Sequence, residues 1–261
     1  MHVSDRVGLF RPALSPRVAG RFAAAALGGV VVYVLVDVVL QFLPPRYSVI
    51  GDAESNLAVG PFGWIMNLNF LGRAVLTLCA AVAIGLSGPP SRLRRAGLAL
   101  MIVAGACSAA LAFLPTDINP PGRYGLLAST LPGTLHLVVA SLGFFAALAG
   151  FALLTGWLRG GRGLSPELRR VYPAALWLTA VAVAGLLCVA LADAFAPTVL
   201  GLAERVCLAG ILGWAFVVCA AIRRAPGGQG FDNSIQVEMS VSGDNDIESM
   251  PSAASHRAKS G

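Results

Sequence analysis

Charged residues are scarce in this chain. Only 12% of its 261 residues are Asp, Glu, Lys or Arg, whereas a soluble domain contains about 25%. Hydrophobic residues make up 56% of the chain, and the mean hydropathy is +0.75. The composition argues against a soluble domain and indicates a protein that is embedded in a lipid bilayer.

The sequence also lacks the usual signatures of metal, redox and phosphate sites. Its five cysteines lie singly in apolar runs, without a CxxC pair, so we expect them to pack as small core residues. The GGQG at residues 227–230 follows no predicted strand and precedes no GK[ST], so it does not indicate a phosphate-binding loop. The net charge of +6 does not indicate a nucleic-acid partner, because the arginines lie between apolar runs rather than on one basic face.

Apolar runs long enough to cross a membrane dominate the sequence instead. The first run would be about 33 Å long as a helix, which exceeds the hydrocarbon core of a bilayer. Pro44, Pro45 and Arg46 follow it, rather than the small residues of a cleavage site, so we expect an uncleaved span. The six predicted spans are Phe22–Leu43, Phe62–Leu86, Ala96–Leu114, Leu131–Leu158, Pro173–Ala192 and Leu200–Ile222. The predicted fold is therefore an all-α bundle of six transmembrane helices, a polytopic integral membrane protein.

The distribution of basic residues predicts how the bundle is oriented. Of the 19 basic residues, 15 lie in the two terminal segments and in the loops after the second and fourth spans. Cytoplasmic loops carry an excess of Arg and Lys, so we expect both termini in the cytoplasm. We divide the chain into a cytoplasmic N-terminal tail (1–21), a six-helix membrane domain (22–222) and a cytoplasmic C-terminal tail (223–261). The second tail is poor in apolar residues, and we expect it to be disordered.

The stretch 46–73 is distinctive because it joins a polar loop to an apolar helix. The loop carries Asp52 and Glu54, and within the helix Asn69 and Arg73 lie one turn apart on the same face. An Arg inside an apolar span is unfavourable unless it has a partner or reaches water. This stretch therefore indicates a site.

The segment ESNLAVGPFGWIMNLNFLGRA at residues 54–74 resembles a bacterial membrane family known as domain of unknown function 998. The segments LPTDINPP and TLHLVVA within 114–140, and GLAERVCLAGILGW at 201–214, are similar to the same family. The resemblance covers about residues 20–222 and implies six helices in a bacterial plasma membrane. It also implies a distant likeness to the eukaryotic DRAM-type membrane proteins, and it implies no particular activity. Arg73 departs from the family's pattern, which has an apolar residue after the position of Gly72.

Polar residues in the first two spans form stripes that we expect to face each other. Tyr33, Asp37 and Gln41 lie at i, i+4 and i+8 in the first span. Asp37 lies about 9 Å inside the end of its span and Arg73 about 13 Å inside its own, so antiparallel neighbours would bring them to similar depth. We predict a buried Asp37–Arg73 ion pair, and we favour a structural clamp over a ligand-binding role.

Other polar residues lie near the same predicted outer side. His136 is a weak candidate for a metal ligand, because a lone His in a span is more often a hydrogen-bonded core residue. No cofactor is indicated by the sequence. The complete candidate site comprises Asp37, Asp52, Glu54, Asn69, Arg73, Asp117, His136, Asp193, Glu204 and Arg205.

These residues leave three functions open. The first is a membrane protein that binds a lipid or a small apolar ligand in an outward-facing cavity with a polar head. The second is a membrane-embedded hydrolase, with or without a metal, that uses the outer carboxylates and His136. The third is a small transporter. The lipid bilayer is the one partner that the sequence itself indicates.

Overall fold

The computed structural model describes residues 16–161 and 163–225. Within these residues the protein is all-helical, and six helices are long and apolar enough to cross a membrane, which confirms the predicted fold class. Residues 1–15 of the predicted N-terminal tail and residues 226–261 of the predicted C-terminal tail lie outside the described residues. The helices are α1 (Pro16–Leu40), η1 (Glu54–Ala58), α2 (Gly63–Gly85), α3 (Arg92–Leu111), α4 (Leu131–Gly160), α5 (Pro166–Arg170), α6 (Tyr172–Phe195), η2 (Pro197–Val199) and α7 (Leu200–Arg224).

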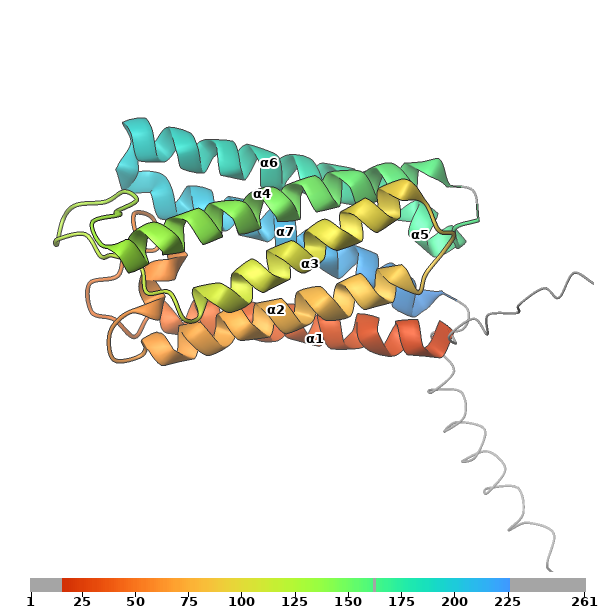
Figure 1. The fold of residues 1–261 in the computed structure, drawn as a ribbon, viewed down its shortest axis with the longest axis horizontal. Coiled ribbons are helices and arrows are strands. Elements are labelled where there is room, and N and C mark those ends of the chain that lie inside the picture. The colour runs from red at the N-terminus through yellow and green to blue at the C-terminus, as the bar shows by residue number, and fades with distance from the viewer. Residues whose placement is uncertain (1–15, 162, 226–261) are drawn as a thin grey trace, which may run out of the picture.

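The six long helices run antiparallel to their neighbours along the chain (Figure 1). One end of the bundle carries η1 and the loops 41–62 and 112–130, and we call it the η1 end. The other end carries α5, and we call it the α5 end. Helix α7 is the central element, because it contacts α1, α2, α4 and α6.

Local chemistry explains where several helices begin and end. Ser91 caps α3 by accepting a hydrogen bond from the Arg94 amide, and Thr130 caps α4 by accepting one from the Gly133 amide. Helix α4 ends at Gly160, and the next residue, Gly161, adopts the left-handed conformation with φ of 60°. Each of the two N-cap side chains satisfies a backbone N–H that the helix leaves without a partner inside it.

Small residues allow two of the helix pairs to pack closely. A Cβ atom on Gly210 of α7 would lie 2.6 Å from the Ala182 amide nitrogen of α6. A Cβ atom on Gly97 of α3 would lie 3.0 Å from the Gly150 carbonyl oxygen of α4. Neither position has room for a side chain, so glycine sets the distance between the helices of each pair.

The core toward the α5 end joins α4, α6 and α7. The rings of Phe151 and Trp214 stack with centroids 4.3 Å apart. The indole N–H of Trp214 donates to the Thr155 hydroxyl at 2.9 Å, and the Thr155 and Thr179 hydroxyls lie 3.1 Å apart. These contacts hold α4 against α6 and α7 toward the α5 end of the bundle.

Candidate functional site

The loop that follows α1 folds back over the η1 end and is held by its own turn. The Asp52 carboxylate accepts a hydrogen bond from the Ser48 amide at 2.8 Å, and the Ser48 hydroxyl accepts one from the Gly51 amide at 3.1 Å. Bonds of this kind are typical of Asp and Ser in tight turns. The structure therefore places Asp52 in the turn that shapes the loop.

Arg205 fastens this loop to the first turns of α7. Its guanidinium donates to the Tyr47 hydroxyl at 2.6 Å and to the Val49 carbonyl at 3.0 Å. The Leu202 amide adds a backbone bond to the Ile50 carbonyl at 3.0 Å. Arg205 thus positions the segment that leads into η1.

A buried polar network forms where η1 meets α1 and α2. The Tyr33 hydroxyl donates to Glu54 Oε1 at 2.8 Å and accepts a hydrogen bond from Arg73 Nη1 at 3.0 Å. Arg73 Nη1 lies 3.9 Å from Glu54 Oε2. The Glu54 side chain is 3% exposed and that of Arg73 is 15% exposed. This network brings a loop carboxyl group to the Arg of the second span.

Further contacts fix the orientation of Arg73. Its Nε donates to the Ser108 hydroxyl at 2.8 Å, and that hydroxyl donates to the Phe70 carbonyl at 2.9 Å. The guanidinium carbon lies 5.1 Å from the centre of the Phe70 ring and 5.4 Å from that of Tyr33. Asn69 supports the network by donating a hydrogen bond to the Tyr33 backbone carbonyl at 3.1 Å, which links α2 to α1.

The predicted Asp37–Arg73 ion pair is wrong, because Arg73 pairs with Glu54 instead. Asp37 Oδ2 accepts a hydrogen bond from Gln41 at 2.6 Å, within the predicted stripe of α1. Its Oδ1 is buried without a hydrogen-bond partner. The physical reason for the error is the loop, which inserts η1 at the position where Asp37 was expected to meet Arg73.

Glu54 is held in a strongly desolvated position. Burial raises the pKa of this carboxyl group from its ordinary value of 4.5 to about 8, and the positive charge of Arg73 opposes that rise. The nearby carboxyl groups of Asp37 and Glu204 raise it further. The Glu54 amide also donates to Glu204 Oε2 at 2.7 Å, which links η1 to α7.

The 112–130 loop and the start of α4 are organised by Asp117 and His136. Asp117 accepts hydrogen bonds from the backbone amides and hydroxyls of Ser129 and Thr130, and these bonds lower its pKa. His136 is 1% exposed, and its Nδ1 lies 2.6 Å from the Leu114 carbonyl oxygen. Because a carbonyl can only accept, Nδ1 carries the proton and Nε2 is left as an acceptor.

A cavity of about 690 Å³ lies between α4, α6 and the start of α7. Its apolar wall comes from residues 137–152 of α4 and 183–190 of α6. At the η1 end its polar lining comprises Glu54, Ser55, Arg73, His136, Ser141, Asp193 and Glu204. The cavity is therefore amphipathic, with an apolar channel that leads to a polar head.

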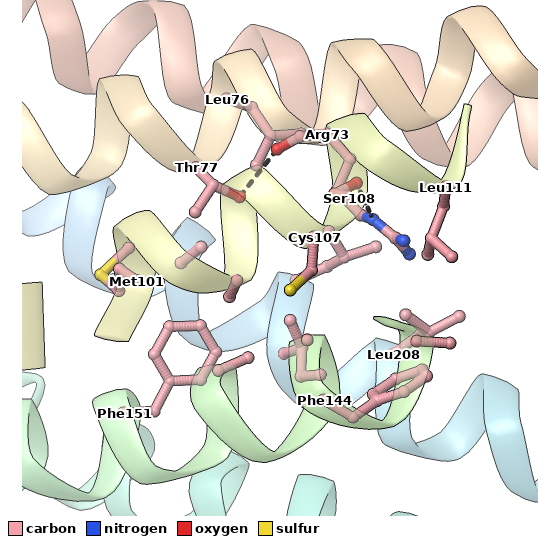
Figure 2. A pocket seen from close by; sticks show the side chains of 17 residues that line it. Arg73, Leu76, Thr77, Met101, Cys107, Ser108, Leu111, Phe144, Phe151 and Leu208 are labelled. Atoms are coloured by element: carbon pink, nitrogen blue, oxygen red, sulfur yellow. Dashed lines mark hydrogen bonds between the residues drawn. The ribbon is translucent and has the colours of Figure 1, made fainter. Parts of the chain in front are cut away.

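A second cavity, of about 60 Å³, adjoins the first and lies deeper between α2, α3, α4 and α7. Figure 2 shows Arg73, Thr77 and Ser108 on one side of it, with Phe144 and Leu208 opposite. Arg73 and Phe144 line both cavities. The Arg73 guanidinium therefore lies at the junction of the two spaces.

The ten residues predicted as a site separate into three groups. Glu54, Arg73, His136, Asp193 and Glu204 line the large cavity. Asn69 and Asp37 lie beside the buried network of Tyr33, Glu54 and Arg73. Asp52, Asp117 and Arg205 shape the loops 41–62 and 112–130 at the η1 end. Asp193 also accepts a hydrogen bond from the Leu126 amide at 2.7 Å.

Two members of the network were outside the predicted site. In the sequence, Tyr33 belongs only to the polar stripe of the first span, and its spacing from Asp37 is the available signal. Ser108 gave no signal, because a single Ser in an apolar span commonly bonds to its own helix.

Comparison with known proteins agrees with the resemblance seen in the sequence. The site itself offers no metal centre: among the residues that the structure describes, no group of three His, Cys, Asp or Glu side chains lies close enough together to hold a metal ion. No curated protein and no solved structure matches the chain. The model of the family described as "Protein of unknown function (DUF998)" matches residues 27–221, which is most of the chain and includes at least part of each of the six long helices. The chain is thus a multi-pass membrane protein that belongs to the DUF998 family.

Proposed function

We propose that this protein binds a lipid, or a small apolar molecule with a polar head, in the large cavity between α4 and α6. The observation that carries the proposal is the amphipathic lining of a space of about 690 Å³. Ligand pockets commonly occupy about 300–1,000 Å³ and combine apolar walls with a few placed polar groups. A lipid has the same division between an apolar chain and a polar end.

The position of the cavity supports entry from the bilayer. Phe145 and Leu187 border it and are 64% and 61% exposed, on the sides of helices that span the membrane. From His136 to Ala152, the α4 wall extends about 24 Å. One leaflet contributes about 15 Å of hydrocarbon, half of the bilayer core, so a single lipid chain has room beside α4.

The orientation proposed for the protein places the polar head on the outer side. The basic residues gather toward the termini and the α5 end, and cytoplasmic loops are enriched in such residues. We therefore propose a bacterial plasma membrane location with cytoplasmic termini and an outward-facing η1 end. In this orientation the ligand is a component of the outer leaflet.

Binding is favoured over hydrolysis or transport by two observations. Within the described residues, no hydrogen bond joins either ring nitrogen of His136 to the Ser55 or Ser141 hydroxyl, so neither serine is activated as a nucleophile. Toward the α5 end, the Thr155 and Thr179 hydroxyls join α4 to α6, and the cavity lining stops short of them, at Ala152 and Val183. A binding site that opens to one leaflet fits this arrangement better than a path across the membrane does.

Native mass spectrometry of the purified protein tests the proposal through a matched pair of variants. Ala190 and Ala184 are both exposed alanines of α6, but only Ala190 lines the cavity. The wild type and Ala184→Trp should retain co-purified lipid after mild detergent exchange, whereas Ala190→Trp should lose most of it. Equal lipid retention by the two variants, with both folded, would contradict binding in this cavity.

A further inference from the structure

We infer that the ligand is a single-chain amphiphile with a cationic ammonium headgroup, an inference that rests on the proposed lipid-binding function. The charges around the polar head of the cavity carry this step. Three carboxyl groups, from Glu54, Asp193 and Glu204, line it together with one guanidinium, from Arg73. The lining therefore has an excess of acidic groups, which suits a cation better than an anion.

The single guanidinium is already engaged by the protein. Arg73 donates to Ser108 and Tyr33, lies 3.9 Å from Glu54, and packs near the rings of Tyr33 and Phe70. An anionic headgroup would have to compete with these contacts and would meet the carboxyl groups beside them. Arg73 is therefore better suited to hold Glu54 in place than to bind a ligand.

Most of the remaining polar side chains offer acceptors, and the Ser55 and Ser141 hydroxyls can accept as well as donate. His136 donates through Nδ1 to Leu114, so its Nε2 presents a lone pair, and no hydrogen bond joins Nε2 to the described part of the chain. The ring is buried and lines the cavity. One oxygen of Glu204 accepts from the Glu54 amide, and its other oxygen remains an acceptor. A primary ammonium brings three donors and no acceptor, and so complements this set.

Proton release is expected to accompany binding of a cation. Burial keeps Glu54 largely protonated at neutral pH, with Tyr33, Asp37, Arg73 and Glu204 as the ionisable groups that face it. An ammonium ion nearby favours the carboxylate form, so binding displaces the proton from Glu54. Binding should therefore tighten as the pH rises from 6 toward 8, while an alkylamine with a pKa near ~10 stays charged throughout.

Competition among three ligands of equal chain length tests the headgroup. Radiolabelled hexadecylamine is bound to the wild type in phosphatidylcholine nanodiscs, and hexadecanol and hexadecanoic acid compete with it. We expect the amine to bind at least tenfold more tightly than the acid or the alcohol. Glu204→Gln should reduce this preference several-fold, since the amide can still accept the Glu54 N–H without carrying charge. If Glu204→Gln does not fold, Asp193→Asn provides the same test from α6.

The outcomes separate the headgroup inference from the proposed function. If all three ligands bind equally to the wild type and Ala184→Trp but not to Ala190→Trp, the cavity binds amphiphiles and the cationic headgroup is wrong. A preference for hexadecanoic acid would also overturn it, and would assign recognition to Arg73. If no ligand binds the wild type more tightly than Ala190→Trp, the proposed function fails as well.

Discussion

Two seams between neighbouring helices differ in the size of the residues that face each other. Between α6 and α7, Gly210 meets Ala182 so closely that there is no space for another atom. Between α4 and α6, leucines line both sides and phenylalanines line the α4 side, and a cavity of about 690 Å³ lies between them. Small residues let helix backbones meet, whereas large residues in partial contact hold them apart. The same membrane bundle thus contains one seam that packs and one that is hollow.

The largest change in stability is expected at the polar end of the cavity between α4 and α6, where Arg73 lies. Replacing Arg73 by Met removes the positive partner of Glu54 and leaves a buried carboxyl group without it. At pH 9, where Glu54 is ionised, we expect a loss of about 3–5 kcal/mol in the free energy of unfolding, because breaking one side of a buried pair leaves the other charge uncompensated. Unfolding in mixed detergent micelles measures the loss.

The double variant Arg73→Met with Glu54→Gln is the control for this prediction. It removes both charges, so it should be less destabilised than Arg73→Met alone. Simple addition of the two single effects would indicate that Arg73 and Glu54 do not stabilise each other.

The packed seam should be sensitive to a single methyl group. In Gly210→Ala the new Cβ would lie 2.6 Å from the Ala182 amide nitrogen, so α6 and α7 must move apart. We expect a loss of about 1–3 kcal/mol from overpacking. Gly28→Ala of α1 is the matched control, because nothing lies within 4 Å of its Cβ and alanine favours a helix. Equal melting temperatures for the two variants would contradict close packing at Gly210.

The stability of the hollow seam should depend on pH. The pKa of Glu54 is raised from 4.5 to about 8 in the folded protein. The folded state therefore holds an extra proton between these values, and its stability falls as the pH rises through this range. One group contributes at most about 1.4 kcal/mol per pH unit. Unfolding curves from pH 5 to 9 should show this slope in the wild type and a flatter profile in Glu54→Gln. An unchanged slope in that variant would assign the dependence to another group.

The smallest effect is expected inside the cavity itself. Ala190→Leu adds three carbon atoms to an exposed alanine that lines the cavity. Because space is available, we expect the free energy of unfolding to change by no more than about 0.5 kcal/mol. A loss comparable to that of Gly210→Ala would show that the α4–α6 seam is packed as tightly as its neighbour.

The six spans could be predicted because bilayer thickness sets the length of an apolar helix. The sequence predicts that the first span starts at Phe22, whereas helix α1 begins at Pro16. Arg17 and Arg21 interrupt the apolar run, yet Ala19 and Gly20 are buried against other helices. A prediction based on the length of the apolar run therefore misses this first part of α1, because its residues are polar on one side and buried on the other.

The site could be predicted only in part, because its geometry depends on a loop. The polar residues of α1 and α2 indicated that charge would be buried at this end, and that is where the network lies. The partner of Arg73 was not predictable from depth along the helices. It is decided by the turn at Asp52 and by the bonds from Arg205, which carry Glu54 into the bundle. The spacing of polar residues along the sequence does not predict the position that such a loop takes in the folded protein.

Ligand entry beside Phe145 and Leu187, as proposed, would change which concentration sets the occupancy of the cavity. Both residues border the cavity and are exposed on membrane-spanning helices, so a molecule that entered between them would come from the bilayer. Its occupancy then follows its mole fraction among the surrounding lipids rather than its amount in the aqueous phase. Two membranes with the same quantity of ligand but different total lipid would load the protein to different extents.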